Sequence, residues 1–241
     1  MNEFQALILG ILQGLTEFLP VSSSGHLEIG HTLLGVNNSN NLLFAVVVHV
    51  ATVLSTLVVF RKDISILIKD LLAFQWNEST IYISKLLFSS VPVLIVGVFF
   101  KEDIEKLYTG NLVMVGSMLL LTALLLGLTH FTKRMDGKIT FFKAILIGIA
   151  QAMAVIPGIS RSGATIATGL LLKTEKSEIA RFSFLMVLIP ILGAALLDIA
   201  NGEISSNHTI GILPLIVGFV AAFLSGLLAC SWMIKIVKRG K

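Results

Sequence analysis

Charged residues are scarce in this chain. Lys, Arg, Asp and Glu make up 13% of its 241 residues, about half the share that soluble domains carry. With the mean hydropathy of +0.92 and the long apolar runs, this predicts a polytopic membrane protein that forms one membrane domain, residues 1–241. The net charge of +4 falls in short loops between apolar runs, as topology charges do, so we expect no nucleic-acid partner.

Cysteine is almost absent as well. Cys230 is the single cysteine of the chain and lies within an apolar run, which excludes an intrachain disulfide and favours a buried, inert thiol. The first twenty residues lack the basic start of a signal peptide, and they lead straight into a polar cluster. We therefore expect them to remain in the mature chain.

That polar cluster, QGLTEFLPVSSSGHLEIGH from Gln13 to His31, lies inside otherwise apolar sequence. Such a cluster is costly in a membrane unless it faces protein or water, so it is a candidate functional site; a plain polar loop is the alternative. Pro20 and the small residues after it break an apolar helix at 3–19, and a second short helix runs to about Leu34. Two half-helices around a break predict a re-entrant hairpin, whose irregular backbone must be buried in protein or line a cavity.

The rest of the chain predicts an all-α fold with about five full spans. A second short helix, break and short helix occupy 139–172, with the break at 157–163, and 63–79 is predicted to be an interfacial connector. The predicted spans are 42–60, 81–100, 112–130, 178–199 and 210–236.

Positive charge predicts the orientation of these spans. With the loops after the first and third spans, the 173–181 segment and the C-terminus inside, fifteen of the eighteen Lys and Arg residues are cytoplasmic. Lys101 and Lys106 fall outside, and Arg161 falls in the second break. This strong bias predicts that the first hairpin enters from the outside and the second from the inside.

The two breaks also belong to an internal repeat with an offset of 138 residues. QGLTEFLPVSSSGHL at 13–27 aligns without a gap on QAMAVIPGISRSGAT at 151–165, with four identities, and Ser23 aligns with Arg161. We expect a first repeat at 1–132 and an inverted second repeat at 139–241, which places a site near the midplane where the broken helices meet. The counterpart of the third span would fall beyond residue 241, so we expect the second repeat to lack it.

The residue types at the two breaks suit phosphate chemistry. Gln13 and Glu17 share one helix face, and a carboxylate at that depth must be protonated, bound to a divalent cation or paired, here with Arg161. The planar guanidinium of Arg161 suits phosphate oxygens. Backbone N–H groups and hydroxyls near it can add donors to an anion, at Gly158, Ser160, Ser162, Gly163 and Thr165.

On the first break, Ser22, Ser23 and Ser24 offer a hydroxyl nucleophile and His26 a base, which predicts phosphoryl transfer or hydrolysis. Structural alternatives stay open: Glu17 as a member of a structural ion pair, Arg161 as a topology charge, and His26 as a cap of the break. We predict that Glu28 and His31 lie outside the site. His49, in the first span, is either a packing residue or a site-lining one.

The motif QGLTEFLPVSSSGH together with PGISRSGAT resembles the undecaprenyl-diphosphatase family, also called bacitracin-resistance proteins. The resemblance covers nearly the whole chain, including ARFSFLMVLIP at 180–190. It implies a multi-pass enzyme of the bacterial inner membrane, with its active site facing the outer side. Members hydrolyse the C55 isoprenyl diphosphate to the monophosphate and phosphate, which recycles the carrier lipid for peptidoglycan synthesis.

The resemblance also implies roles for single residues. Glu17 and the Gln13 position belong to an acidic motif associated with a divalent cation, Mg²⁺ or Ca²⁺. Ser23 is implied as the nucleophile and His26 as its proton-transfer partner, with a phosphoserine or direct attack by water both open. Arg161 is implied to hold the diphosphate, together with Ser22, Ser24, Gly158, Ser160, Ser162, Gly163 and Thr165.

The chain departs from the family pattern in two places. Many members have Glu where this chain has Gln13, which leaves one carboxylate there, and typical members carry one further C-terminal span, whose absence bears on bundle closure and on a homodimer. The rival class is a transporter or flippase of the lipid phosphate, because inverted repeats with opposed hairpins are a transporter design. A structural or regulatory membrane protein is a third, weaker alternative.

Overall fold

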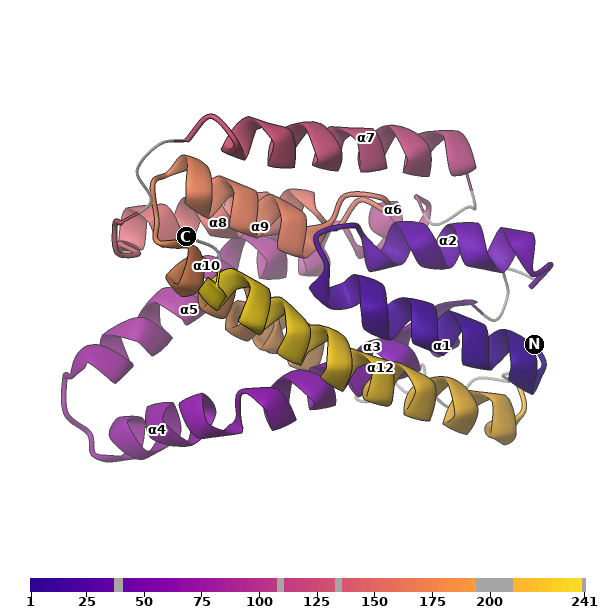
Figure 1. Ribbon diagram of the computed structural model, residues 1–241, viewed down its shortest axis with the longest axis horizontal. Helices are drawn as coiled ribbons and strands as arrows, with labels where there is room; N and C mark the ends of the chain where they lie inside the picture. The colour runs from indigo at the N-terminus through magenta and orange to yellow at the C-terminus, as the bar shows by residue number, and fades with distance from the viewer. Residues whose placement is uncertain (37–40, 108–110, 133–135, 194–209, 240–241) are drawn as a thin grey trace.

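Helix boundaries in the computed structural model follow signals written in the sequence (Figure 1). The structure describes residues 1–36, 41–107, 111–132, 136–193 and 210–239. Small polar side chains begin most helices by accepting a first-turn N–H, as at Asn2, Asn77, Asn111 and Thr140. The helices are α1 Glu3–Phe18, α2 Ser23–Leu33, α3 Asn41–Val59, α4 Arg61–Leu72, α5 Glu78–Phe99, α6 Lys101–Glu105, α7 Leu112–Thr129, α8 Phe141–Met153, α9 Arg161–Leu171, α10 Lys176–Met186 and α12 Ile212–Arg239.

Three helices in the described part of the chain, α5, α7 and α12, are long and apolar enough to cross a membrane. A fourth crossing is reached if α3 and α4 count as one span, although they bend by 77° at their junction. Charged residues follow that bend at Arg61, Lys62 and Asp63, and burying them in lipid would be costly. The helical part of the predicted connector at 63–79 is thus confirmed, and the chain is an all-helical membrane protein.

The predicted span at 178–199 differs from the structure. Helix α10 ends at Met186, Val187 is a turn, and helix resumes at 188–193; the remainder of the predicted span lies outside the described residues. Pro190 explains the interruption, because it has no N–H to donate to the carbonyl of Met186 and is tolerated only in the first turn of a helix. Hydropathy alone counts such a segment as one span.

The predicted short helices on either side of each break are confirmed. Helices α1 and α2 flank the first break, and α8 and α9 flank the second. Shifted by 138 residues, the bounds of α2 coincide with those of α9, and α1 begins where α8 begins. The offset that aligns the two motifs therefore also aligns the helices around them.

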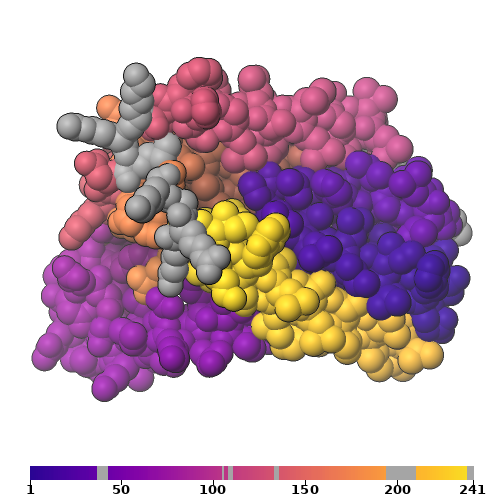
Figure 2. Space-filling view, in the orientation of Figure 1, coloured from indigo at the N-terminus to yellow at the C-terminus, as the bar shows by residue number. Residues whose placement is uncertain are grey.

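The packing of these helices repeats in a crossed manner. Helix α1 packs along α12, and α8 packs against α5, while the offset relates α1 to α8 and the middle of α12 to α5. Figure 2 shows α12 lying across one face of the molecule against the N-terminal helices. Two apolar cores support the arrangement, one around Phe182 and Phe184 and the other around Leu9 and Phe44.

Equivalent glycines permit both close helix contacts. A Cβ added to Gly10 of α1 would lie 2.4 Å from the carbonyl oxygen of Gly218, and one added to Gly148 of α8 would lie 2.2 Å from the carbonyl oxygen of Ser89. No real Cβ approaches a carbonyl oxygen so closely, so each pair of backbones touches only because a side chain is missing.

We predict that Gly148→Ala destabilises the protein by about 1–3 kcal/mol, because the new methyl group pushes α8 away from α5. The thermal unfolding midpoint of the protein in detergent measures the loss. Gly127→Ala is the matched control, since an added Cβ there meets nothing within 4 Å. Equal midpoints for the two variants would contradict the close packing of α8 on α5.

Candidate active site

The two breaks lie directly against each other. A Cβ added to Gly25 would be 3.1 Å from the Cα of Gly158, and the hydroxyl of Ser162 donates to the carbonyl of Leu19 at 3.2 Å. Gly158 has φ of +95° with the backbone of Val115 close by, so a larger residue would meet both strain and a clash. Residues 138 positions apart in sequence therefore form one site.

Both half-helices that leave the breaks begin in the same way. Ser22 accepts the N–H of Gly25 at 3.2 Å, and Ser160 accepts the N–H of Gly163 at 3.0 Å. Each capping hydroxyl also lies 3.3 Å from the hydroxyl of the serine two residues on. The remaining first-turn N–H groups of a helix have no partner within it, so the two helix starts bring partial positive charge to one place.

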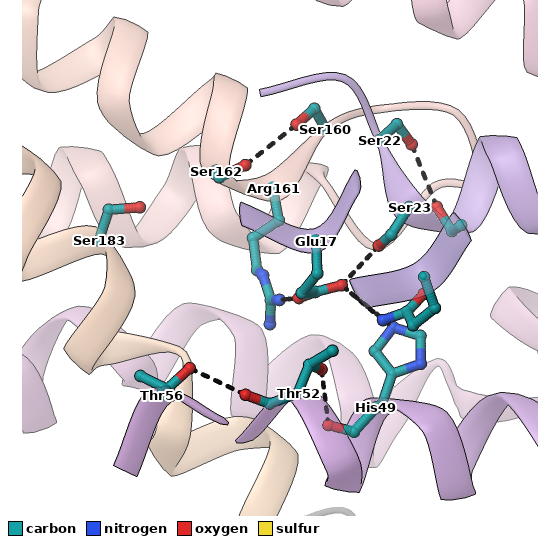
Figure 3. Close-up of polar contacts among 12 residues, drawn as sticks. Glu17, Ser22, Ser23, His49, Thr52, Thr56, Ser160, Arg161, Ser162 and Ser183 are labelled. Carbon is teal, nitrogen blue, oxygen red and sulfur yellow. Dashed lines mark hydrogen bonds and ion pairs between the residues drawn. The ribbon is translucent and has the colours of Figure 1, made fainter. Parts of the chain in front are cut away.

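The first of these caps is held under strain. Ser22 is buried and has φ of +67°, a left-handed conformation that costs a non-glycine residue roughly 1–3 kcal/mol. The following residue, Ser23, opens α2 and points its hydroxyl toward Glu17 (Figure 3). The strained turn thus sets the direction of the predicted nucleophile.

Glu17 is the centre of the site. Its Oε1 pairs with Nη2 of Arg161, which reaches it from the second break. Its Oε2 accepts hydrogen bonds from Ser23 Oγ at 2.5 Å and from Gln13 Nε2 at 2.9 Å. His49 Nε2 lies 3.6 Å from the same Oε2, so Figure 3 shows Glu17 between Arg161 on one side and Ser23 and His49 on the other.

Burial makes this pairing obligatory. The Glu17 side chain is 7% exposed and that of Arg161 is 25% exposed. Removing a carboxylate from water costs several kcal/mol, which only opposite charge and hydrogen bonds offset. The structural ion pair that the sequence left open for Glu17 is therefore present, and it joins the two breaks.

The geometry around His26 differs from the predicted proton transfer. His26 Nδ1 hydrogen-bonds the carbonyl of Ser22 at 2.8 Å, whereas the hydroxyl of Ser23 donates to Glu17. The nearest proton acceptor for Ser23 is thus a carboxylate and not an imidazole. Thr165 lies one turn inside α9, where its hydroxyl contacts Ser183 at 2.7 Å.

Glu28 and His31 are both buried on α2, away from the contacts of Glu17. The ring of His31 packs edge-on against Phe44, with the centroids 6.3 Å apart. These two residues lie where the sequence predicts them, outside the cluster at Glu17.

A small open pocket with about 310 Å³ of empty space adjoins Arg161 and contains residues that sequence reasoning missed. Hydroxyls line one end and apolar side chains the other. Positions 49, 52 and 56 follow helical spacing on one face of α3, a signal that could have found this end. The lining residues are Glu17, Phe18, Thr52, Val53, Thr56, Arg161, Ser162, Ser183, Phe184, Val187 and Ile191.

The site offers few ligands to a metal ion from charged side chains alone. Within the described ranges, no three His, Cys, Asp or Glu side chains gather as a metal site. Gln13 Oε1, however, is a fully buried oxygen without a hydrogen-bond partner among the described residues, next to Glu17. A carboxylate and an adjacent amide oxygen fit a divalent cation whose other ligands come from a substrate.

Apolar helices of membrane length surround a buried carboxylate–guanidinium pair, several serines and two helix N-termini. This combination defines a helical membrane protein with an anion-binding site of catalytic composition. The chain belongs to the family of the bacitracin resistance protein BacA, whose profile matches residues 6–241.

Curated relatives agree with this membership. The undecaprenyl-diphosphatase of Bacteroides fragilis is 55% identical over 245 residues, which cover the whole chain and 92% of the relative. That of Christiangramia forsetii is 52% identical over 243 residues, with the same coverage. The undecaprenyl-diphosphatase of Carboxydothermus hydrogenoformans is 40% identical over 246 residues, the whole chain and 91% of the relative.

We predict that Arg161→Gln destabilises the protein by roughly 3 kcal/mol, because it leaves the carboxylate of Glu17 buried without its cation. The double variant Glu17→Gln/Arg161→Gln should recover much of that loss, since no unpaired charge remains. Thermal unfolding of the three proteins in detergent provides the comparison. A double variant less stable than Arg161→Gln would show that the pair does not hold the breaks together.

Proposed function

We propose that this protein hydrolyses undecaprenyl diphosphate to undecaprenyl phosphate and phosphate, and so returns the carrier lipid to peptidoglycan synthesis. The observation that carries the proposal is the junction of Glu17, Ser23 and Arg161, which places an acceptor, a hydroxyl and a phosphate-binding cation in contact. Full-length relatives that bear the name undecaprenyl-diphosphatase support the choice of substrate. Bacitracin resistance follows from the same recycling.

In the proposed reaction, the hydroxyl oxygen of Ser23 attacks the terminal phosphorus of the diphosphate. Glu17 accepts the hydroxyl proton through the contact already present. The bond to the bridging oxygen breaks, undecaprenyl phosphate leaves, and water releases phosphate from the serine. Direct attack by a water molecule held at Ser23 is the alternative, with the same proton acceptor.

Arg161 changes partner in this scheme. Without substrate its guanidinium pairs with Glu17, and with substrate its planar fork can bind phosphate oxygens. The N-termini of α2 and α9, capped by Ser22 and Ser160, add N–H donors that stabilise developing negative charge. Ser24, Gly158, Ser162 and Gly163 shape this cradle, while Thr165 supports it through Ser183. The uncommitted Nε2 of His26 is available for the second proton transfer.

A divalent cation, Mg²⁺ or Ca²⁺, is part of the proposal. Glu17 would hold it, with the buried amide oxygen of Gln13 as a second donor. When bound, the cation supplies neutralisation of the charge on the diphosphate oxygens. Gln13 itself remains neutral, so this chain offers one carboxylate where many members offer two.

The lipid tail has a path in the proposed complex. The apolar end of the pocket, which includes Phe18, Val53 and Phe184, lies beyond the ion pair and the hydroxyls. A diphosphate bound at Arg161 would therefore extend its first isoprenoid units along these side chains, toward the interruption of helix at Val187.

The membrane arrangement is part of the same proposal. We infer two inverted repeats, each with a re-entrant hairpin, about five spans, and a site that opens to the outer side of the inner membrane. The shared helix bounds and the crossed packing of α1 with α12 and α8 with α5 support the repeats. The excess of Lys and Arg in the loops assigned to the cytoplasm supports the orientation. A homodimer is compatible with this arrangement.

The crossed packing also favours one rival, a flippase of the lipid phosphate, because repeats related in this way underlie alternating access. Vesicles that carry the lipid in one leaflet separate the two functions. Phosphate release without lipid movement is expected for the enzyme, and movement without release would support the flippase.

We predict that Ser23→Ala lowers phosphate release from farnesyl or undecaprenyl diphosphate in detergent by at least about a thousandfold, as loss of a nucleophile does. Arg161→Lys should lower it by about a hundredfold, because an ammonium cannot replace the bidentate fork. Ser117→Ala and Arg61→Lys, at exposed positions of α7 and α4, are the matched controls and should keep full activity. Full activity in both site variants would overturn the assignment.

The orientation yields a separate prediction. Cysteines placed at Lys69 and Lys106, both exposed, should react differently with a membrane-impermeant maleimide on intact cells, with only the one at Lys106 labelled. Cys230 is fully buried and gives little background. Labelling only at Lys69 would invert the proposed topology.

A further inference from the structure

His49 is held in a defined protonation geometry beside Glu17. Its Nδ1 lies 2.7 Å from the carbonyl oxygen of Ala45, one turn earlier on α3. Since a carbonyl oxygen only accepts hydrogen bonds, Nδ1 carries the ring proton, and a neutral ring presents the bare lone pair of Nε2 on its other side. That lone pair faces Oε2 of Glu17 (Figure 3).

The distance between these two atoms favours a bridging ion. Nε2 of His49 and Oε2 of Glu17 are 3.6 Å apart, too far for a hydrogen bond. Two lone pairs that face each other repel, but two ligands each about 2.1 Å from one metal ion lie roughly 3–3.5 Å apart. The carbonyl of Ala45 also supplies the backbone acceptor that usually orients a metal-binding histidine.

A third donor meets the same oxygen. Gln13 Nε2 donates to Oε2 of Glu17 at 2.9 Å, and the other amide atom, Oε1, is buried without a partner among the described residues. Rotation of the amide by half a turn exchanges the two atoms and brings Oε1 to face Oε2. Gln13, Glu17 and His49 thus converge on one point from α1 and α3, without any backbone movement.

We propose that His49 is a metal ligand and that Nε2 of His49, Oε2 of Glu17 and Oε1 of Gln13 form a mixed nitrogen–oxygen site that binds Mn²⁺ in preference to Mg²⁺ or Ca²⁺. This inference rests on the proposed diphosphatase function, because diphosphate oxygens complete the coordination. An imidazole ligand raises affinity for transition metals over the hard alkaline-earth ions. It also compensates for the carboxylate that position 13 lacks.

Charge explains why the cation and the anion bind together. Glu17 and Arg161 neutralise each other in the present structure, so a divalent cation alone would add two positive charges to a buried site. A diphosphate offsets that charge and draws Arg161 from Oε1 of Glu17 to its own oxygens. The metal site is therefore expected to be strong only when a diphosphate group is present.

The test is Mn²⁺ binding, measured by electron paramagnetic resonance of the free ion on purified protein in detergent with methylenediphosphonate. We expect His49→Leu to weaken Mn²⁺ binding at least about tenfold, as loss of a ligand does. His130→Leu, at an exposed histidine that ends α7, is the matched control and should bind as the unaltered protein does. Equal affinity in the protein and in His49→Leu would overturn the proposal, as would no Mn²⁺ binding by the unaltered protein.

A second variant keeps the test decisive if leucine disturbs α3. His49→Gln replaces the nitrogen ligand by an amide oxygen, so it should weaken Mn²⁺ binding and leave that of Mg²⁺, measured by its competition with Mn²⁺, nearly unchanged. An unaltered order of preference would contradict nitrogen ligation. Ser23→Ala separates this inference from the proposed function: Mn²⁺ binding retained without phosphate release supports both, whereas phosphate release lost in Ser23→Ala together with equal Mn²⁺ affinity in His49→Leu leaves the function standing and removes the metal role of His49.

Discussion

The buried ion pair between Glu17 and Arg161 is the contact on which the site depends. Each residue follows or precedes a break in a short helix, and neither break can be stable alone in a membrane with its charge uncompensated. Their pairing neutralises both charges and brings two segments far apart in sequence into contact. The close approach of Gly25 to Gly158 is the backbone counterpart of that contact.

The same pair accounts for the chemistry that we propose. A carboxylate that holds Arg161 on one oxygen and Ser23 on the other is both a proton acceptor and a store for the phosphate-binding cation. A diphosphate can displace the guanidinium, because it offers more negative charge, and this displacement frees Glu17 for its other ligands. The ground-state structure is thus a neutral site that the substrate opens.

The sequence predicted much of the fold and of the site. Pro20, Pro157 and the serine–glycine runs predicted both breaks, and the offset of 138 predicted that Ser23 and Arg161 meet near one point. It could not predict the helix end at Met186, because Pro190 lies in an apolar run that hydropathy reads as one span. Nor could it show that Ser23 donates to Glu17 and not to His26, since that choice depends on the strained turn at Ser22. Thr52 and Ser183 were missed because a single hydroxyl on an apolar helix is ordinary in sequence.

The exchange of the two charges is the most direct measurement of this account. In the variant Glu17→Arg/Arg161→Glu, the ion pair can re-form across the breaks, but the carboxylate now starts from the second break and the cation lies beside Ser23. We predict a thermal midpoint above that of either single variant, together with loss of phosphate release from farnesyl diphosphate. Phosphate release near that of the unaltered protein would contradict the roles assigned to the two residues.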